Sequence, residues 1–262
     1  MSEYNPNLFS AKKSLGQNFL IDLNIIQKIV RAADISSEDI IIEVGPGPGA
    51  LTYPIITSAP RHLYLVEKDT SIAEHWQKYE AKTVTVVNQD ALKLNIGDLT
   101  DGKPCKIISN LPYNVGTELL IGWLGHPNIQ SMVLMFQKEV VDRIVAKPGT
   151  KAYGRLSILT QWLCEIEKLF DVPPNAFKPA PKVTSSVVRV IPRSKPLFAV
   201  DQNKLEHLTQ ACFHQRRKML RKSLKALFGD NTESICQQSG VNPLSRPEEL
   251  SIEQFCALAN KI

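Results

Sequence analysis

The sequence has few cysteines, and their arrangement does not suit a structural framework. Five cysteines are scattered over 262 residues, their number is odd, and none belongs to a CxxC pair. A disulfide scaffold or a cysteine zinc site needs paired or closely spaced thiols. The five histidines show no ligand spacing either, so we predict no metal centre. Scattered free thiols are typical of a reducing compartment, which predicts a cytoplasmic protein.

Long apolar runs are also missing. No stretch approaches the roughly 18 apolar residues that a membrane span requires. The apolar group Phe19-Leu20-Ile21 ends at once at Asp22, which makes it too short for the core of a signal peptide. We therefore expect no membrane association.

Neither sign of charge dominates the chain. Lys and Arg number 31 against 26 Asp and Glu, which gives a formal charge of +5. The 43% of hydrophobic residues is enough for a sizeable core in a globular protein. A modest positive excess permits an anionic partner without requiring one, so the position of the charge matters more than its sum.

Short β-branched runs alternate with longer helical patterns between residues 40 and 190. Five runs lack polar alternation, as parallel strands covered by helices on both faces do. They are IIIEV (40–44), HLYLV (62–66), TVTVV (83–87), KIISN (106–110) and MVLMF (132–136). A sixth run, VTSSVVRVI (183–191), alternates better and predicts an antiparallel edge strand. The pattern predicts an α/β fold with a Rossmann-like, doubly wound sheet.

A domain boundary is expected near residue 195. The proline-rich stretch 171–182 is typical of an ordered loop, and the periodicity changes around 191–201. We predict a catalytic domain over residues 1–195 and a small all-helical domain over residues 196–262. No feature indicates an obligate dimer, so we expect a monomer.

The first predicted strand runs into a glycine-rich turn, EVGPGPGALT (43–52). Gly45 and Gly47 allow the backbone to approach a ligand closely before a helix begins. Pro46 and Pro48 remove two backbone N–H donors from the turn, and the glycine spacing differs from the dinucleotide fingerprint. Binding of a pyrophosphate is therefore disfavoured, although a nicotinamide dehydrogenase stays open as an alternative.

Carboxylates follow the next two predicted strands. Glu67 ends the second strand about 20 residues after the glycine turn, where a carboxylate can accept both ribose hydroxyls. Asp90, in NQDALK (88–93), follows the third strand and suits an exocyclic adenine amine. A ribose and an adenine without phosphates describe S-adenosylmethionine, which we predict as the cofactor.

The fourth predicted strand ends in Asn110, followed by Leu111-Pro112-Tyr113. If the Asn110 side-chain oxygen and the Leu111 main-chain oxygen each accept a hydrogen from an adenine N6 amine, the nitrogen lone pair is turned towards the donated methyl group. Pro112 fixes the direction of that carbonyl, and Tyr113 offers a stacking surface. Orientation and electrostatic complementarity then supply the catalysis.

Phe177, in NAFKPAP, is a candidate for a second aromatic wall opposite Tyr113. A phenylalanine between prolines also fits a core position, so both interpretations stay open here. An adenine turned out of a hairpin loop costs a few kcal/mol of unstacking, which two aromatic faces could offset.

The stretch CFHQRRKMLRKSLK (212–225) is basic and lacks acidic residues. Apolar residues recur in and after it at helical spacing, which predicts a helix with one packed face and one basic face. The predicted RNA-binding residues are Arg216, Arg217, Lys218, Arg221, Lys222 and Lys225. Five further cations could extend this surface: Lys12, Lys13, Lys147, Lys151 and Arg155. Phosphate binding by such a surface weakens steeply with salt.

Taken in order, these motifs resemble one family. SLGQNFLID, EVGPGPGALT, NQDALK, SNLPYNV, FQKEVVDRI, FKPAPKVTSSVVR and HQRRKMLRKSLK are similar to motifs of the ribosomal RNA adenine dimethyltransferases of the KsgA type. The resemblance extends from Lys13 to about Lys225.

The resemblance implies roles for individual residues. Asn18 and Leu20 would belong to an N-terminal segment that closes over S-adenosylmethionine, and Gly45 would lie against its methionine part. Glu67 and Asp90 would bind its ribose and its adenine. The family adds two methyl groups to each of two adjacent adenosines in a hairpin loop near the 3′ end of 16S rRNA. The expected partner is therefore 16S rRNA within an assembling small subunit.

Three alternatives remain open at this point. The chain could methylate large-subunit rRNA, as enzymes of the resistance type do, or adenine in DNA. It could act mainly as an assembly factor whose binding matters more than its methyl transfer. A nicotinamide dehydrogenase on a similar sheet is the third alternative.

Overall fold

The computed structural model describes residues 4–12, 15–214 and 218–262. The chain divides into two compact units. The first contains Met1–Val141 and Ile166–Pro192, and the second contains Asp142–Glu165 and Arg193–Ile262. The sequence predicted a boundary near 195 and assigned only residues 196–262 to the second domain. The structure differs in that residues 142–165 also pack with the C-terminal helices.

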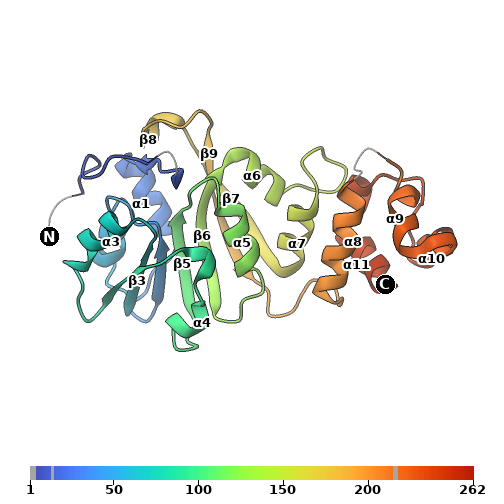
Figure 1. The fold of residues 1–262 in the computed structure, drawn as a ribbon, viewed down its shortest axis with the longest axis horizontal. Helices are drawn as coiled ribbons and strands as arrows, with labels where there is room; N and C mark the ends of the chain where they lie inside the picture. The colour runs from blue at the N-terminus through green and yellow to red at the C-terminus, as the bar shows by residue number, and fades with distance from the viewer. Residues whose placement is uncertain (1–3, 13–14, 215–217) are drawn as a thin grey trace. The chain divides into compact units, whose positions relative to one another are not determined.

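A seven-stranded sheet of order β4-β3-β2-β5-β6-β9-β7 forms the first unit (Figure 1). The strands are β2 (Ile40–Val44), β3 (His62–Glu67), β4 (Val84–Asn88), β5 (Cys105–Asn110), β6 (Ile129–Gln137), β7 (Cys164–Val172) and β9 (Ser185–Pro192). The pairs from β4 to β6 are parallel, and β9 is antiparallel to β6. The five apolar runs therefore form the predicted parallel strands, and the Rossmann-like sheet is confirmed.

One expectation about the sheet was wrong, and one strand was missed. The run at 183–191 was predicted as an edge strand, but β9 lies between β6 and β7. The edge strand β7 was not predicted at all. Its sequence CEIEKLFDV places charged residues among the apolar ones, as a half-exposed edge strand does. An ion pair between Arg189 on β9 and Glu167 on β7 joins the two strands.

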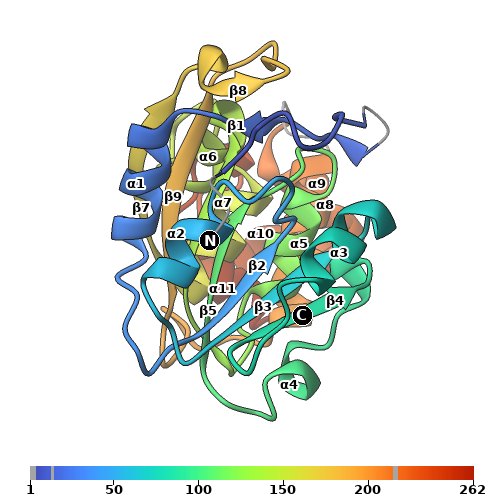
Figure 2. The ribbon, with the colours of Figure 1, turned by 90° about the vertical axis from the view of Figure 1, so that its left-hand side faces the viewer.

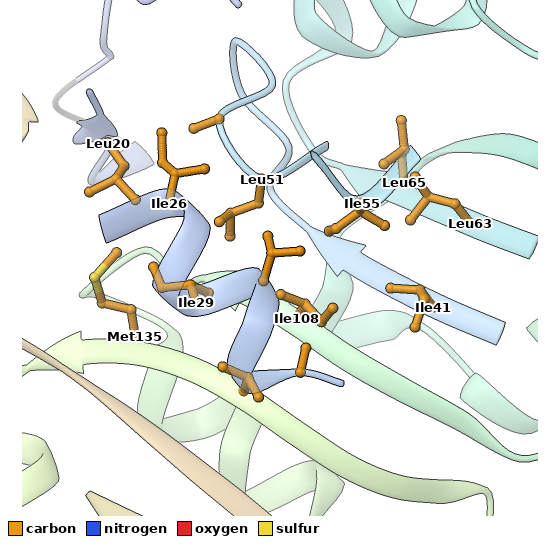
Figure 3. Close-up of a cluster of buried hydrophobic side chains, with 14 of the residues drawn as sticks. Leu20, Ile26, Ile29, Ile41, Leu51, Ile55, Leu63, Leu65, Ile108 and Met135 are labelled. Carbon is orange, nitrogen blue, oxygen red and sulfur yellow. The ribbon is translucent and has the colours of Figure 1, made fainter. Parts of the chain in front are cut away.

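Helices α1 (Leu23–Ala32), α2 (Thr52–Thr57) and α3 (Thr70–Gln77) share one hydrophobic cluster with the sheet. Figure 3 shows Ile29 of α1 near Ile108 of β5, and Ile26 of α1 and Ile41 of β2 belong to the same cluster. Successive strand residues point to opposite faces, so these strand residues belong to one face. Apolar burial of this kind contributes about 25 cal/mol per Å².

The opposite face of the sheet is also covered. Ile42 and Ile107 are fully buried although they point away from that cluster. Helix α5 (Gly116–Trp123) packs on this side, because a Cβ built at Gly116 would lie 3.1 Å from the Phe136 ring of β6. Both faces of the sheet are therefore buried, which explains why its parallel strands are apolar without polar alternation.

The N-terminal part of the chain forms a small ribbon with a distant segment. Strand β1 (Phe19–Leu20) pairs antiparallel with β8 (Phe177–Lys178), which Figure 2 shows side by side. The Ile21 N–H also donates to the Ala176 carbonyl at 2.7 Å. The predicted loop 171–182 therefore contains a short strand that holds the N-terminal segment in place.

The second unit is mainly helical. Its helices are α7 (Arg155–Leu163), α8 (Gln202–His214), α9 (Leu220–Phe228), α10 (Thr232–Gln238) and α11 (Ile252–Ala259). Helix α6 (Lys138–Ile144) runs across the division between the units, and the short α4 (Ile96–Leu99) belongs to the first. Phe213 of α8 stacks on Phe255 of α11 with ring centroids 5.8 Å apart. The predicted helical C-terminal part is confirmed.

All five cysteines are free and buried. Burial raises the pKa of the Cys105, Cys164 and Cys212 thiols to about 12. The three are therefore fully protonated at neutral pH. Within the described part of the chain, no helix has the length and apolar character to cross a membrane.

Candidate functional site

A pocket lies at the carboxyl ends of strands β2, β3, β4 and β5 in the first unit. It has an empty volume of about 960 Å³, which includes space open to solvent. The structure brings nine sequence-predicted residues to its wall. They are Asn18, Gly45, Gly47, Glu67, Asp90, Asn110, Leu111, Pro112 and Tyr113.

The glycine turn after β2 borders open space at Gly45 and is tightly packed at Gly49. Gly45 has φ +72°, and a Cβ built on it would meet nothing within 4 Å, so its backbone borders open space. At Gly49, with φ +96°, a Cβ would lie 2.8 Å from the Trp76 ring. The Trp76 indole N–H donates to the Gly47 carbonyl at 2.9 Å. The Trp76 side chain therefore supports the turn at Gly47 and Gly49, while the backbone at Gly45 borders open space.

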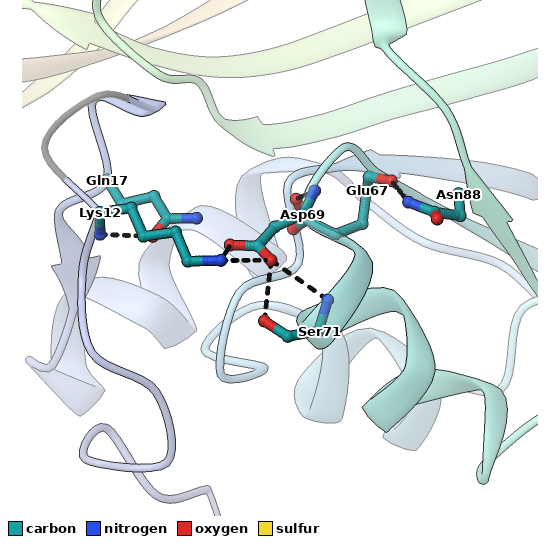
Figure 4. A network of polar contacts seen from close by, with 6 residues as sticks. All are labelled: Lys12, Gln17, Glu67, Asp69, Ser71 and Asn88. Atoms are coloured by element: carbon teal, nitrogen blue, oxygen red, sulfur yellow. Dashed lines mark hydrogen bonds and ion pairs between the residues drawn. The ribbon is translucent and has the colours of Figure 1, made fainter.

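Glu67 is held at the end of β3 by main-chain contacts. Its Oε1 accepts the Asp69 N–H at 2.8 Å, and its main-chain oxygen accepts the Asn88 side-chain amide at 2.8 Å (Figure 4). Burial raises the pKa of this carboxyl above its ordinary value, and main-chain hydrogen bonds from Asp69 and Gly47 oppose that shift. The carboxyl thus has a fixed position from which to accept ligand hydroxyls.

Asp90 follows β4 and keeps its charge. Lys68 donates to its Oδ2 at 2.7 Å, and the Leu92 N–H donates to its Oδ1 at 3.1 Å. The Lys68 hydrogen bond and the Leu92 N–H lower the pKa of Asp90. Each oxygen has a second lone pair, so the carboxylate can still accept a hydrogen from an amine. The pairing with Lys68 was not indicated by any sequence pattern.

Asn110 ends β5 with its side-chain amide held from one side. Its Nδ2 donates to the Asn18 main-chain carbonyl at 3.0 Å. One of the two N–H donors of this nitrogen is therefore used, and the Oδ1 acceptor faces no partner among the described residues, which leaves it available to a ligand. The preceding residue, Ser109, donates its hydroxyl to the Val44 carbonyl at 2.6 Å, which ties β5 to β2 directly below the pocket.

The turn after Asn110 positions an aromatic ring. The Pro112 carbonyl accepts the N–H groups of Val115 and Gly116 at 3.2 and 3.0 Å, which closes the turn and starts α5. The hydroxyl groups of Tyr113 and Ser185 are 2.5 Å apart, and Ser185 opens strand β9. Burial raises the pKa of the Tyr113 phenol, so the ring is neutral and fixed at both ends.

Two predicted site residues do not line this pocket. Leu20 and Phe177 are 1% and 3% exposed and belong to the hydrophobic cluster of Figure 3. They face each other in the β1–β8 ribbon. In this structure Phe177 presents no free ring face, so its role as a second stacking wall stays a prediction.

Sequence reasoning missed Glu43, the residue before the glycine turn. Its side chain is 2% exposed and borders a small hollow next to Gly45 and Asn110. Burial raises the pKa of this carboxyl to about 8, and the charge of Glu67 acts in the same direction. Glu43 is therefore mainly neutral at pH 7. A buried acid at a strand end gives no signal in the sequence, because strand ends usually lie open to solvent.

Sequence reasoning did not indicate the ion pair of Lys12. This residue was one of five cations that could extend the basic surface, and in the structure its Nζ lies 2.7 Å from Asp69 Oδ2 (Figure 4). Burial alone would raise the pKa of the Asp69 carboxyl. The hydrogen bonds from Lys12 and Ser71 outweigh that effect, and the pKa of Asp69 is lowered. The charge of Lys12 is thus used inside the first unit.

The predicted basic helix is not continuous. Helix α8 ends at His214 and α9 begins at Leu220, with Met219 extended before it. The first N–H groups of α9 donate to the carbonyls of Ser245 and Pro243, a tertiary cap that the local sequence does not encode. Lys218, Arg221, Lys222 and Lys225 are exposed, while Arg216 and Arg217 lie outside the described residues. The described residues contain no cluster of side chains that could hold a metal ion.

Comparison with known proteins supports the same interpretation. A profile of the family "Ribosomal RNA adenine dimethylase" matches residues 8–262. Several proteins named ribosomal RNA small subunit methyltransferase A are similar to this chain. The one from Rhodospirillum rubrum is 49% identical over 257 residues, 96% of this chain and 88% of the relative. The one from Agrobacterium fabrum is 49% identical over 259 residues, 95% of this chain and 92% of the relative.

Two solved structures share the fold over most of the chain. A dimethyladenosine transferase from Plasmodium falciparum has a TM-score of 0.76 at 25% identity, covering 92% of this chain and 95% of that one. The 23S rRNA methyltransferase ErmE has a TM-score of 0.70 at 25% identity, covering 93% and 99%. With the family profile covering nearly the whole chain and the sheet, glycine turn and strand-end residues in place, the chain belongs to the ribosomal RNA adenine dimethylase family.

Proposed function

We propose that the protein transfers methyl groups from S-adenosylmethionine to N6 of adenosines in small-subunit ribosomal RNA. Each of two adjacent adenosines, in a hairpin loop near the 3′ end of 16S rRNA, would receive two methyl groups. The observation that carries this proposal is the Asn110 amide, whose nitrogen is bound to the Asn18 carbonyl at 3.0 Å and whose oxygen is left for the substrate amine.

The pocket residues fit this methyl donor. Glu67 would accept the ribose hydroxyls, Asp90 the adenine amine, and the open space over Gly45 would receive the methionine part. Both carboxyls follow neighbouring strands of the sheet, so they can bind one nucleoside together. When bound, the donor supplies an electrophilic methyl group on a positively charged sulfur.

Asn110 and Leu111 would act on the target amine. An adenine N6 lone pair is delocalised into the ring and is a weak nucleophile. Acceptance of one N6–H by Asn110 Oδ1 and the other by the Leu111 carbonyl turns that lone pair towards the methyl carbon. The new N–C bond forms as the S–C bond breaks, and the nitrogen then releases a proton to solvent. The contribution of these residues is orientation and stabilisation of positive charge.

Tyr113 would hold the plane of the base. Its ring lines the pocket and its hydroxyl is fixed by Ser185. Stacking of a base on one aromatic ring contributes about 1–3 kcal/mol, comparable with the cost of turning an adenine out of a loop. Phe177 could add a second wall only after leaving the hydrophobic cluster.

Substrate binding would involve the second unit. The exposed cations of α9 and Lys218 suit RNA phosphates, so we propose the C-terminal domain as the part that binds rRNA in the particle. A monomeric protein acting in the cytoplasm on the small subunit or its precursor fits this proposal. The large-subunit alternative has less support, because ErmE is 25% identical and the small-subunit relatives are 49% identical.

The test uses purified protein, S-adenosylmethionine and three substrates: small subunits, large subunits and duplex DNA. Mass spectrometry of the digested nucleosides should find N6,N6-dimethyladenosine in small-subunit rRNA alone. Transfer confined to the other two substrates would contradict the proposal. So would calorimetry that detects saturable binding of NAD and none of S-adenosylmethionine.

A further inference from the structure

The N-terminal segment crosses the pocket and touches several of its walls. We give the name strap to Lys12 together with residues 15–20, and residues 13 and 14 lie outside the described part. Gly16 lies against the turn after β5, since a Cβ built on it would come within 2.9 Å of the Asn114 side-chain oxygen. The Phe19 ring covers Gly47, whose Cβ would lie 3.1 Å from it. The strap therefore bridges the glycine turn and the Asn110 turn.

We propose that the strap is a positioning element that sets the orientation of the Asn110 amide. The catalytic oxygen would face the substrate amine only while the strap is in place. This inference rests on the proposed function, but it concerns a contact that can be measured without any activity.

The chemistry of an amide side chain makes its orientation decisive. A rotation of 180° about the last side-chain bond exchanges its oxygen acceptor for its nitrogen donor. With the nitrogen in the pocket, two donors would face each other and the amine could not be held. The Asn18 carbonyl accepts hydrogen bonds and cannot donate them, so it selects the orientation in which Asn110 Nδ2 faces it at 3.0 Å.

The Asn18 carbonyl is held from the N-terminal side by a clasp between Lys12 and Asp69. The Lys12 ammonium is 2.8 Å from Asp69 Oδ1 and 2.7 Å from Oδ2. The Asp69 side chain is 4% exposed and also accepts the Ser71 hydroxyl at 2.8 Å, so the acid is a rigid partner. The acid is shielded from solvent while the Lys12 side chain is half exposed, so salt screens this pair in part.

The clasp is connected to the rest of the strap. The Lys12 N–H donates to Gln17 Oε1 at 2.9 Å, and the Leu15 N–H donates to the Lys12 carbonyl at 3.1 Å. Figure 4 shows Lys12 between Gln17 and Asp69. Hydrogen bonds therefore link the ion-paired Lys12 to Leu15 and to Gln17, the residue before Asn18.

The strap is held from the C-terminal side by the β1–β8 ribbon. Phe19 pairs with Lys178 and Leu20 with Phe177, and Leu20 is 1% exposed. Asn18 lies between this anchor and the clasp. Removing the clasp should free the part of the strap before Phe19 without disturbing the hydrophobic cluster.

A magnetic-resonance experiment tests the orientation directly. Protein labelled with ¹⁵N-asparagine is compared as wild type, Lys12→Met and the matched control Lys103→Met. Lys103 is similarly exposed, at 52% against 51%, and pairs with Asp101 at 3.5 Å. We expect the hydrogen-bonded Asn110 side-chain proton to exchange about ten-fold faster in Lys12→Met and to be unchanged in Lys103→Met. An Asn110 signal that is the same in all three proteins would overturn the inference.

A kinetic cycle separates positioning from donor binding. At saturating donor and particle, Lys12→Met should lower kcat about ten-fold in the Asn110 protein, the effect of one ordinary hydrogen bond. In an Asn110→Ala background the same change should leave kcat unaltered and alter only the donor KM. Equal loss of kcat in both backgrounds, or no loss in either, would show that the strap does not act through the amide.

The two proposals fail in different ways. A wild-type protein that methylates no adenosine in small subunits removes the proposed function, while the exchange measurement still reports on the amide. If the wild type is active and the exchange rate of the Asn110 side-chain proton is the same in Lys12→Met, the inference alone is refuted.

Discussion

Asn110 and Glu43 border the same small hollow, and the surroundings of each decide its chemical state. Asn110 has its nitrogen bound to Asn18, whereas Glu43 Oε2 is buried without a hydrogen-bond partner among the described residues. The first becomes a directed acceptor and the second a neutral acid. The positions of Asn110, Glu67 and Asp90 were predictable because each follows a recognisable strand. The contacts of Glu43 and of Lys12 were not, because they depend on residues far away in the chain.

Replacement of Asn110, the proposed catalytic amide, gives the first prediction. Asn110→Ala should lower turnover by about 10²–10³, by analogy with the loss of one transition-state hydrogen bond. Single-turnover transfer of a labelled methyl group to small subunits measures this loss. Asn24→Ala, which changes an exposed asparagine on α1, should retain wild-type turnover. A loss of less than ten-fold in Asn110→Ala would contradict the assigned role.

Glu43 gives a prediction about pH. Its pKa is about 8 in the folded protein against an ordinary value of 4.5, so the folded state keeps a proton that the unfolded state loses. The stabilisation from Glu43 is complete below pH 4.5 and is lost as the pH rises towards 8. In Glu43→Gln the free energy of unfolding should therefore fall less between pH 5 and pH 8 than in the wild type. Denaturant unfolding at several pH values measures both curves, and parallel curves would refute the assignment.

The elements of the sheet were predictable where their sequence pattern has one meaning. The runs of Ile and Val in β2 and β5 fit only buried strands, and they lie where the pattern placed them. Strand β7 was missed because its charged residues hide the alternation. Without β7, the strand β9 was wrongly expected at the edge of the sheet. The start of α9 was missed because carbonyls of residues 243 and 245 cap it. Local patterns therefore predict an element well unless contacts with a distant segment decide where it starts or which strand it pairs with.

The basic face of α9 gives a prediction at this scale. Changing Arg221, Lys222 and Lys225 to Gln should weaken binding to small subunits and reduce the slope of log K against log salt by about 0.7–0.9 per lost phosphate contact. Binding measured at several potassium chloride concentrations gives the slope. As a control, Lys78, Lys82 and Lys103 of the first unit are changed to Gln, which removes the same charge. Identical slopes in the two triple variants would exclude α9 as the RNA contact.

At the scale of the whole molecule, the two proposed activities belong to different units. Every residue that lines the pocket lies in the first unit, and the exposed cations of α9 lie in the second. Methyl transfer and particle binding should therefore be separable by substitution. This bears on the alternative in which the protein serves mainly as an assembly factor.

Asn110→Ala makes that separation measurable. The variant should bind small subunits with an affinity within about two-fold of the wild type, because no phosphate contact is changed. Sedimentation with the particle measures binding, and growth of a deletion strain carrying the variant measures function. Full growth and normal subunit maturation with the inactive variant would show that the assembly role dominates. Loss of particle binding would show that the two activities are not separable.

The burial of all five cysteines has a practical consequence. The folded protein presents no native thiol that a maleimide dye or a cross-linker could reach. A single cysteine introduced at an exposed position of α9 would therefore be the one labelled residue, with no native sulfur removed first. Proximity mapping on the ribosomal particle could then start from the wild-type chain.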